Sequence, residues 1–166
     1  MNSSSRPTHR LQFLARMVQK EITYLQQTDR RLFEAPFTRE KAGQLEQDID
    51  LAERVDAFVS RFGRLQDTVG DKLLPAYLSV VGEHVGTALD NLNRAEKLGW
   101  VESVEIWMAL RGLRNQMVHE YMEDLDQLAE ALNKGHEYVP MLVKDATSIL
   151  VDMETRGSIT PQASRT

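Results

Sequence analysis

One apolar pattern in the middle of the chain constrains its fold more than any other feature. Apolar residues recur every four or three positions, at Leu51, Val55, Phe58, Phe62, Leu65 and Val69. This spacing places them on one face of an α-helix. A seam of this kind is expected where long helices pack nearly antiparallel. Strict alternation typical of strands is hard to find in the chain, and glycine (9) and proline (5) are scarce.

The same helical period recurs on both sides of this seam. A first amphipathic helix is predicted up to about Arg31, from Leu11, Leu14, Val18, Ile22 and Leu25. The dipeptide Ala35-Pro36 breaks this helix, and Thr38 is predicted to cap a short entry to the next one. The central seam continues past Gly70, with a kink predicted at Pro75.

Glycines and capping residues mark the later helix ends. Gly82 and Gly86 are predicted to close the central segment. Thr87, followed three residues later by Asp90, predicts a helix start, and Gly99 predicts its stop.

Two more helical stretches complete the chain. Ser103 is predicted to cap a helix that runs through about Met122. The last stretch starts near Leu125 and extends to Met153, with Pro140 expected to kink or restart it.

These patterns predict an all-α domain of about five helices, built around an antiparallel four-helix bundle. The length of 166 residues is typical of a single domain. Residues 9–155 are predicted to form the bundle. Residues 1–8 and 156–166 are low in apolar content, and we expect them to be mobile tails.

Composition excludes several classes of protein. Cysteine is absent, which removes disulfides, thiolate metal sites and cysteine nucleophiles, and suits a cytoplasmic protein. No apolar run is long enough to span a membrane, and the polar start is not a signal peptide. The net charge of −5 argues against a protein that mainly binds nucleic acid non-specifically, but it does not exclude a local basic site.

Familiar catalytic motifs are also missing. The sequence has no phosphate-binding glycine loop, no dinucleotide fingerprint and no nucleophile elbow. None of the histidines (His9, His84, His119 and His136) has a glutamate three positions earlier, as a di-iron bundle would require. We therefore predict neither a metal site nor a bound cofactor.

One polar constellation remains, on the helix predicted to run through Met122. At about 100° per residue, Arg114, Asn115, His119 and Tyr121 would share an arc of roughly 160°, and Arg111 would lie one turn earlier. A histidine can move a proton near neutral pH, and arginine can bind and stabilise a phosphate. Without a metal or a protein nucleophile, the reaction best served is attack on phosphate by the 2′-hydroxyl of RNA. A two-fold dimer would supply a second histidine as the acid.

A purely structural interpretation stays open for the same residues. Polar clusters on helices are often solvated or buried in an interface with their hydrogen bonds satisfied. On the preceding long helix, Arg61, Arg64 and Asp67 step along one face. They either support the cleft or form an intrahelical strip of ion pairs.

The spacing Arg114-Asn115-x-x-x-His119-x-Tyr121 resembles the Arg-x4-His-x-Tyr motif of the HEPN superfamily, in its HepT-like toxin branch. The segment 61–67, Arg-Phe-Gly-Arg-Leu-Gln-Asp, is similar to the corresponding helix of these proteins. The resemblance covers roughly residues 9–153.

The resemblance implies a homodimeric, metal-independent endoribonuclease. It places the catalytic roles on Arg114 and His119, with Asn115 supporting them. It also implies a nucleotidyltransferase antitoxin that uses ATP and magnesium to attach AMP to Tyr121. Two alternatives remain: a non-catalytic partner of a nucleotidyltransferase, and a plain structural helical protein. The acidic residues beside the motif would repel RNA unless they face away; they are Glu120, Glu123, Asp124 and Asp126.

Overall fold

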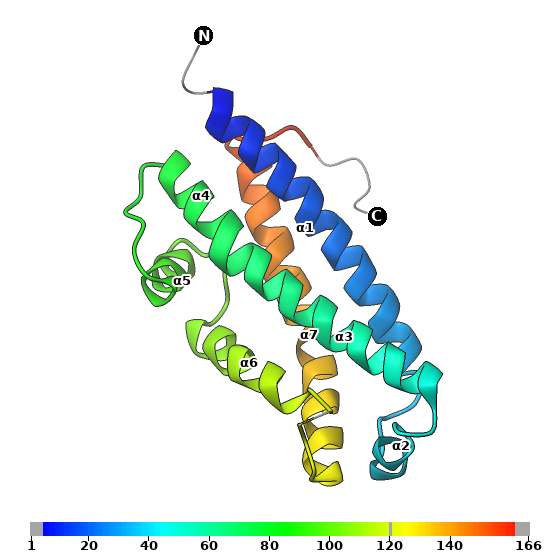
Figure 1. The fold of residues 1–166 in the computed structure, drawn as a ribbon. Helices are drawn as coiled ribbons and strands as arrows, with labels where there is room; N and C mark the ends of the chain where they lie inside the picture. The colour runs from blue at the N-terminus through cyan, green and yellow to red at the C-terminus, as the bar shows by residue number, and fades with distance from the viewer. Residues whose placement is uncertain (1–4, 120, 162–166) are drawn as a thin grey trace. The chain divides into compact units, whose positions relative to one another are not determined.

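A computed structural model describes residues 5–119 and 121–161. Every regular element in these ranges is a helix, as the sequence predicts, and no strand occurs in them (Figure 1). The elements are α1 (Ser5–Leu32), α2 (Arg39–Gly43), α3 (Ile49–Asp67), the π-helical stretch η1 (Thr68–Leu73), α4 (Leu74–Val80), α5 (Ala88–Lys97), α6 (Val104–Gln116) and α7 (Leu125–Thr155). Among these helices, none is long and apolar enough to cross a membrane.

The contacts within the chain divide it into two units. Unit 1 contains Met1–Lys20, Gln66–Val104 and Leu142–Thr166, and unit 2 contains Glu21–Leu65 and Glu105–Met141. Helices α1, α3 and α7 each contribute residues to both units. The predicted four-helix bundle, its likeness to the HEPN fold and the dimer stay predictions.

Several helix ends lie where capping chemistry predicts them. The Thr38 hydroxyl accepts a hydrogen bond from the Lys41 amide at 3.2 Å at the start of α2. At the start of α5, the Thr87 side chain accepts from the Asp90 amide and the Asp90 carboxylate accepts from the Thr87 amide, a reciprocal capping box. Gly99 follows α5 with a φ of +78°, a conformation that favours glycine.

The kinks predicted at the two internal prolines stay predictions, whereas a helix restart at Pro140 is wrong. Pro75 lies at the start of α4, which directly follows the helical stretch η1. The irregularity falls just before it, in η1. Pro140 neither ends nor restarts a helix, because α7 runs through it from Leu125 to Thr155.

The helix that carries the polar motif is shorter than predicted. The sequence predicts that it reaches Met122, but α6 ends at Gln116, and the Met117 amide bonds to the Arg114 carbonyl at 3.2 Å in a tighter turn. Met117 is the last buried residue of the stripe. The next stripe position is Tyr121, whose exposed fraction is 80 %. A longer helix would therefore bury no further apolar surface there.

The predicted tails are partly structured. Helix α1 begins at Ser5, so residues 5–8 are helical. After α7, Ile159 is buried, and the Thr160 amide donates to Gln12 Oε1 at 2.9 Å. Residues 1–4 and 162–166, which complete those two predicted tails, lie outside the described residues.

Unit 1 is organised around a buried tyrosine. The Tyr77 ring stacks on Trp100 with centroids 4.7 Å apart, and its hydroxyl donates to Asp152 at 2.6 Å. Asp152 also accepts from Arg156 Nε at 2.8 Å. Burial, and then the hydrogen bond to Asp152, raise the pKa of Tyr77 well above its usual value.

In unit 2, the close approach of helices fixes the end of α6. A Cβ atom at Gly135 of α7 would lie 2.9 Å from Met117 Sδ and 3.3 Å from the ring of Phe58 on α3. The absence of a side chain at Gly135 therefore lets α7 pack closely against the last buried residue of the stripe. Asn133, half a turn of α7 away, accepts from the Phe37 amide and donates to its carbonyl, at 3.0 and 2.7 Å.

Candidate functional site

The arginine of the motif lies against a glycine of α3. Arg114 is in the last turn of α6 and is half-buried. A Cβ atom at Gly63 would lie 2.6 Å from both Nε and Nη2 of Arg114, and 2.7 Å from its Cζ. The guanidinium group thus occupies the space that any other residue at position 63 would fill.

The histidine of the motif pairs with a carboxylate of α3 as well. His119 lies in the turn after α6, and its Nδ1 is 3.2 Å from Asp56 Oδ1. The His119 side chain is 19 % exposed and the Asp56 side chain is 57 % exposed. When Nδ1 carries the hydrogen and donates it to Asp56, the lone pair of Nε2 is available to accept a proton from a ligand.

These two contacts share one face of α3. Asp56 and Gly63 are seven residues apart, close to two full turns, so both point in nearly the same direction. The end of α6 and the following turn therefore lie along α3, with Arg114 over Gly63 and His119 beside Asp56. A guanidinium group and an imidazole are thus brought to one face of α3, although the continuous helix predicted to carry both residues ends at Gln116.

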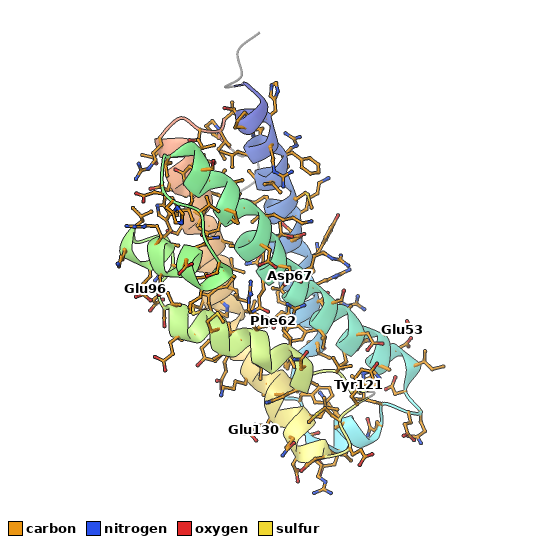
Figure 2. The ribbon with its side chains drawn as sticks, turned by 60° about the vertical axis from the view of Figure 1, so that its left-hand side comes forward. Glu53, Phe62, Asp67, Glu96, Tyr121 and Glu130 are labelled. Carbon is orange, nitrogen blue, oxygen red and sulfur yellow. The ribbon has the colours of Figure 1, made fainter. Side chains whose placement is uncertain are left out.

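The other motif residues are more exposed. Asn115 lies at the exposed surface of the last turn of α6. Tyr121 lies in the turn between α6 and α7 (Figure 2), and its side chain is exposed, with an exposed fraction of 80 %. Arg111 is half-buried one turn before Arg114, and Glu120 lies outside the described residues.

A pocket of about 590 Å³ opens beside His119. Its walls combine apolar side chains with His119 and two glutamates; the lining residues are Ala42, Leu45, Glu46, His119, Met122, Glu123, Leu125 and Leu128. The carboxylates of Glu46 and Glu123 add negative charge to this pocket. That charge disfavours a phosphate inside it.

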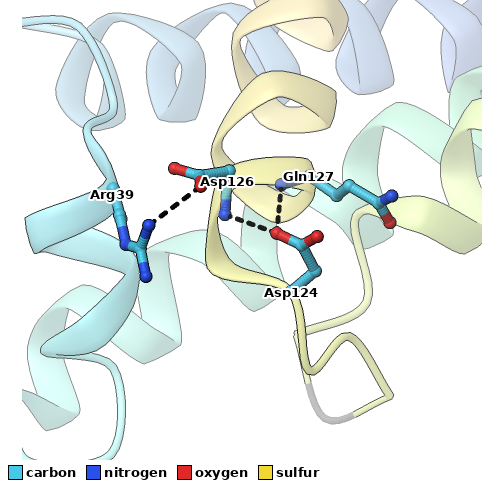
Figure 3. A network of polar contacts seen from close by, with 4 residues as sticks. All are labelled: Arg39, Asp124, Asp126 and Gln127. Atoms are coloured by element: carbon cyan, nitrogen blue, oxygen red, sulfur yellow. Dashed lines mark hydrogen bonds and ion pairs between the residues drawn. The ribbon is translucent and has the colours of Figure 1, made fainter.

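The next two acidic residues are engaged in local structure. The Asp124 carboxylate accepts from the amides of Asp126 and Gln127, at 3.0 and 3.1 Å, and so caps the start of α7 (Figure 3). Asp126 forms an ion pair of 2.9 Å with Arg39 of α2 (Figure 3). Part of the negative charge that follows the motif is therefore offset within unit 2.

Of the residues predicted as possible supports, Arg64 is exposed, and its Nη2 donates to Ser60 of the same helix at 3.4 Å. Asp67 is the last residue of α3. Both alternatives for these two residues, support of the cleft and an intrahelical strip of ion pairs, stay predictions. Arg61 turns toward α1, where it donates to the Tyr24 carbonyl and the Thr28 hydroxyl.

Sequence reasoning misses two residues of this site, Asp56 and Gly63. Gly63 enters it only as part of the segment 61–67, and Asp56 not at all. The available signal is their spacing of seven on the central helix, which places a small residue and a carboxylate on one face. In the described ranges, no three His, Asp or Glu side chains are grouped as metal ligands would be.

Comparison with known proteins adds no further constraint. No family model, no curated protein and no solved structure matches the chain. The likeness to the HEPN superfamily therefore rests on the sequence alone, on the motif from Arg114 to Tyr121 and the segment 61–67.

Proposed function

We propose that this chain is a metal-independent endoribonuclease of the HEPN type, the toxin partner of a nucleotidyltransferase antitoxin. One observation carries the proposal. His119 pairs through Nδ1 with Asp56, which leaves Nε2 for proton transfer, on the turn that directly follows the helix of Arg114. A base held by a carboxylate and an arginine on the same helix face supply two of the three functions that cleavage of RNA through its own 2′-hydroxyl needs, and the third is an acid for the leaving oxygen.

The proposed reaction divides the work among these residues. His119 Nε2 takes the proton of the 2′-hydroxyl, the 2′-oxygen bonds to phosphorus, and the bond from phosphorus to the 5′-oxygen breaks. Arg114 binds the phosphate and stabilises the negative charge that develops on it. Asn115 orients the phosphate. In a homodimer, His119 of the second copy protonates the leaving 5′-oxygen, and the products are a 2′,3′-cyclic phosphate and a 5′-hydroxyl.

Tyr121 is the proposed control point. Its phenol oxygen bonds to the α-phosphorus of ATP on the antitoxin, and pyrophosphate leaves. The attached AMP adds negative charge and bulk two residues from His119. It would compete with RNA for Arg114. The exposure of Tyr121 supports this role, because the antitoxin must reach the hydroxyl.

The decisive experiment is RNA cleavage in excess chelator by protein whose intact mass shows no attached AMP. We expect cyclic-phosphate ends from the wild type and no cleavage by His119→Ala. His84→Ala is the matched control, because His84 is an exposed histidine of unit 1. Cleavage by His119→Ala equal to wild type would overturn the assignment of the base.

A second candidate function is a non-catalytic partner of a nucleotidyltransferase. The glutamates of the pocket beside His119 favour it, because Glu46 and Glu123 oppose an RNA phosphate there. This candidate predicts that unmodified, folded protein cleaves no RNA substrate and still binds a nucleotidyltransferase. Cleavage that depends on His119 eliminates it.

A further inference from the structure

A second groove of unit 2 lies between α1 and α3, and the proposed reaction does not use it. Its volume is about 370 Å³. Three arginines line it together with one hydroxyl, one alanine and two carboxylates; the residues are Thr28, Arg31, Asp50, Glu53, Arg54, Ala57 and Arg61. Three guanidinium groups in one groove are unusual for a chain with a net charge of −5.

Arg61 is fixed in this groove by its neighbours. Its Nη1 donates to the Tyr24 carbonyl at 3.2 Å and to the Thr28 hydroxyl, and its Cζ lies 5.5 Å above the Tyr24 ring. A guanidinium held in this way loses little conformational freedom when it binds an anion.

The other two arginines of the groove, Arg31 and Arg54, differ from Arg61 in their contacts. In the part of the chain that the structure describes, neither the Arg31 nor the Arg54 side chain takes part in an ion pair or a hydrogen bond. Arg54 is half-buried, so its charge loses part of its hydration without a compensating contact. Asp50 and Glu53 moderate the positive charge of the groove without pairing with these arginines.

The groove and the His119 site lie on different faces of the same helix. Arg54, Ala57 and Arg61 share one face of α3, which is about 140° around the axis from the face of Asp56 and Gly63. Between the two faces runs an exposed strip with Glu53, Ser60 and Arg64. A strand of RNA that crosses this strip at the level of His119 enters the groove.

We propose that the groove binds backbone phosphates of the substrate RNA, away from the bond that is cut. The proposal rests on the proposed function for the identity of the ligand. The chemistry of the groove is that of phosphate recognition, because arginine forks match phosphate oxygens and the Thr28 hydroxyl adds a further polar group. Phosphate contacts of this kind position an RNA without reading its sequence.

The test measures binding separately from cleavage. A short fluorescein-labelled single-stranded RNA is titrated with the full chain carrying His119→Ala, which keeps the RNA intact, over a series of salt concentrations. Adding Arg31→Gln and Arg54→Gln should weaken binding and reduce the slope of log K against log salt by about 1.4, about 0.7 for each phosphate that an arginine no longer neutralises. Arg16→Gln with Arg30→Gln is the control, because both are exposed, lie outside the groove and change the net charge equally.

A second variant, with the opposite expected effect on RNA binding, tests the proposal even if the arginine variant is misfolded. Asp50→Asn with Glu53→Gln removes the two carboxylates of the groove and should tighten RNA binding, whereas Glu40→Gln with Asp71→Asn, at exposed positions elsewhere, should tighten it less. Equal effects of groove and control variants on RNA binding overturn the groove even if the wild type cleaves RNA. A third outcome separates the two proposals. If only the groove variant loses RNA binding and the wild type cleaves no RNA, the groove is supported and the proposed nuclease activity is rejected.

Discussion

Unit 2 contains two histidine–aspartate pairs, and their surroundings differ. His119 lies in a turn, and it pairs with Asp56, the more exposed partner, at 3.2 Å. His136 lies within α7, and its Nδ1 is 2.6 Å from Asp29 of α1, whose side chain is only 14 % exposed. The His136 ring also stacks on Phe33, with centroids 4.4 Å apart. In the first pair the histidine is the less exposed partner, and in the second the carboxylate is.

This difference distinguishes a candidate functional site from a contact that only stabilises the fold. His136 connects α7 to α1 through a short polar contact and a ring stack, which hold two helices of unit 2 together. His119 lines a pocket and lies within five residues of Arg114. In the proposed function, the His119 pair takes part in chemistry, whereas the His136 pair only stabilises unit 2. We base this distinction on the pocket beside His119 and on Arg114, which lies five residues before His119 in the sequence.

Exchanging each histidine for glutamine gives the largest expected contrast. His119→Gln should lower the rate of RNA cleavage by about a thousandfold, because it removes the proton acceptor, and should leave the urea midpoint unchanged. His136→Gln should leave cleavage unchanged and lower the free energy of unfolding by about 1–2 kcal/mol. Cleavage rates and urea titrations of both variants check this. A reversed pattern would move the site to α7.

The two aspartates give a smaller contrast of the same kind. Asp56→Asn should lower kcat by about ten- to a hundredfold with little change in KM, because Asp56 positions His119 without touching the RNA. Asp56→Glu should restore part of the rate. Asp29→Asn should reduce stability by about 1 kcal/mol and leave kcat as it is. If Asp56→Asn raised KM alone, Asp56 would act on RNA binding and not on the histidine.

The sequence predicts those features that depend on near neighbours. Thr87 with Asp90 and the glycine at position 99 mark the ends of α5 because the capping groups are a few residues apart. The all-helical class follows from the seam that begins at Leu51. The motif residues Arg114 and His119 are likewise identified from their local spacing.

The end of α6 and the partners of the motif could not be predicted in this way. Helix α6 stops where Met117 meets Gly135, a residue of α7 that is distant in sequence. Asp56 and Gly63 acquire their roles from contacts with residues more than fifty positions further along the chain. The division into two units likewise depends on which segments pack together, and helical periodicity carries no information about that.

The smallest expected effect tests the position of Arg114 over Gly63. A methyl group at Gly63 would lie 2.6 Å from Nε and Nη2 of Arg114, so Gly63→Ala forces the guanidinium aside. Because the displaced atoms are the end of a flexible side chain, we expect a stability change below about 1 kcal/mol. We also expect a fall in kcat of about tenfold, because the displaced guanidinium stabilises the negative charge that develops on the phosphate less well.

Gly112→Ala, on α6 itself, adds a methyl group where no atom of another element lies within 4 Å. It should keep the cleavage rate and raise the free energy of unfolding by about 0.5–1 kcal/mol, because alanine favours a helix interior. If both variants cleave RNA at the wild-type rate, the position of Arg114 over Gly63 is not needed, and His119 alone sets the two pairs apart.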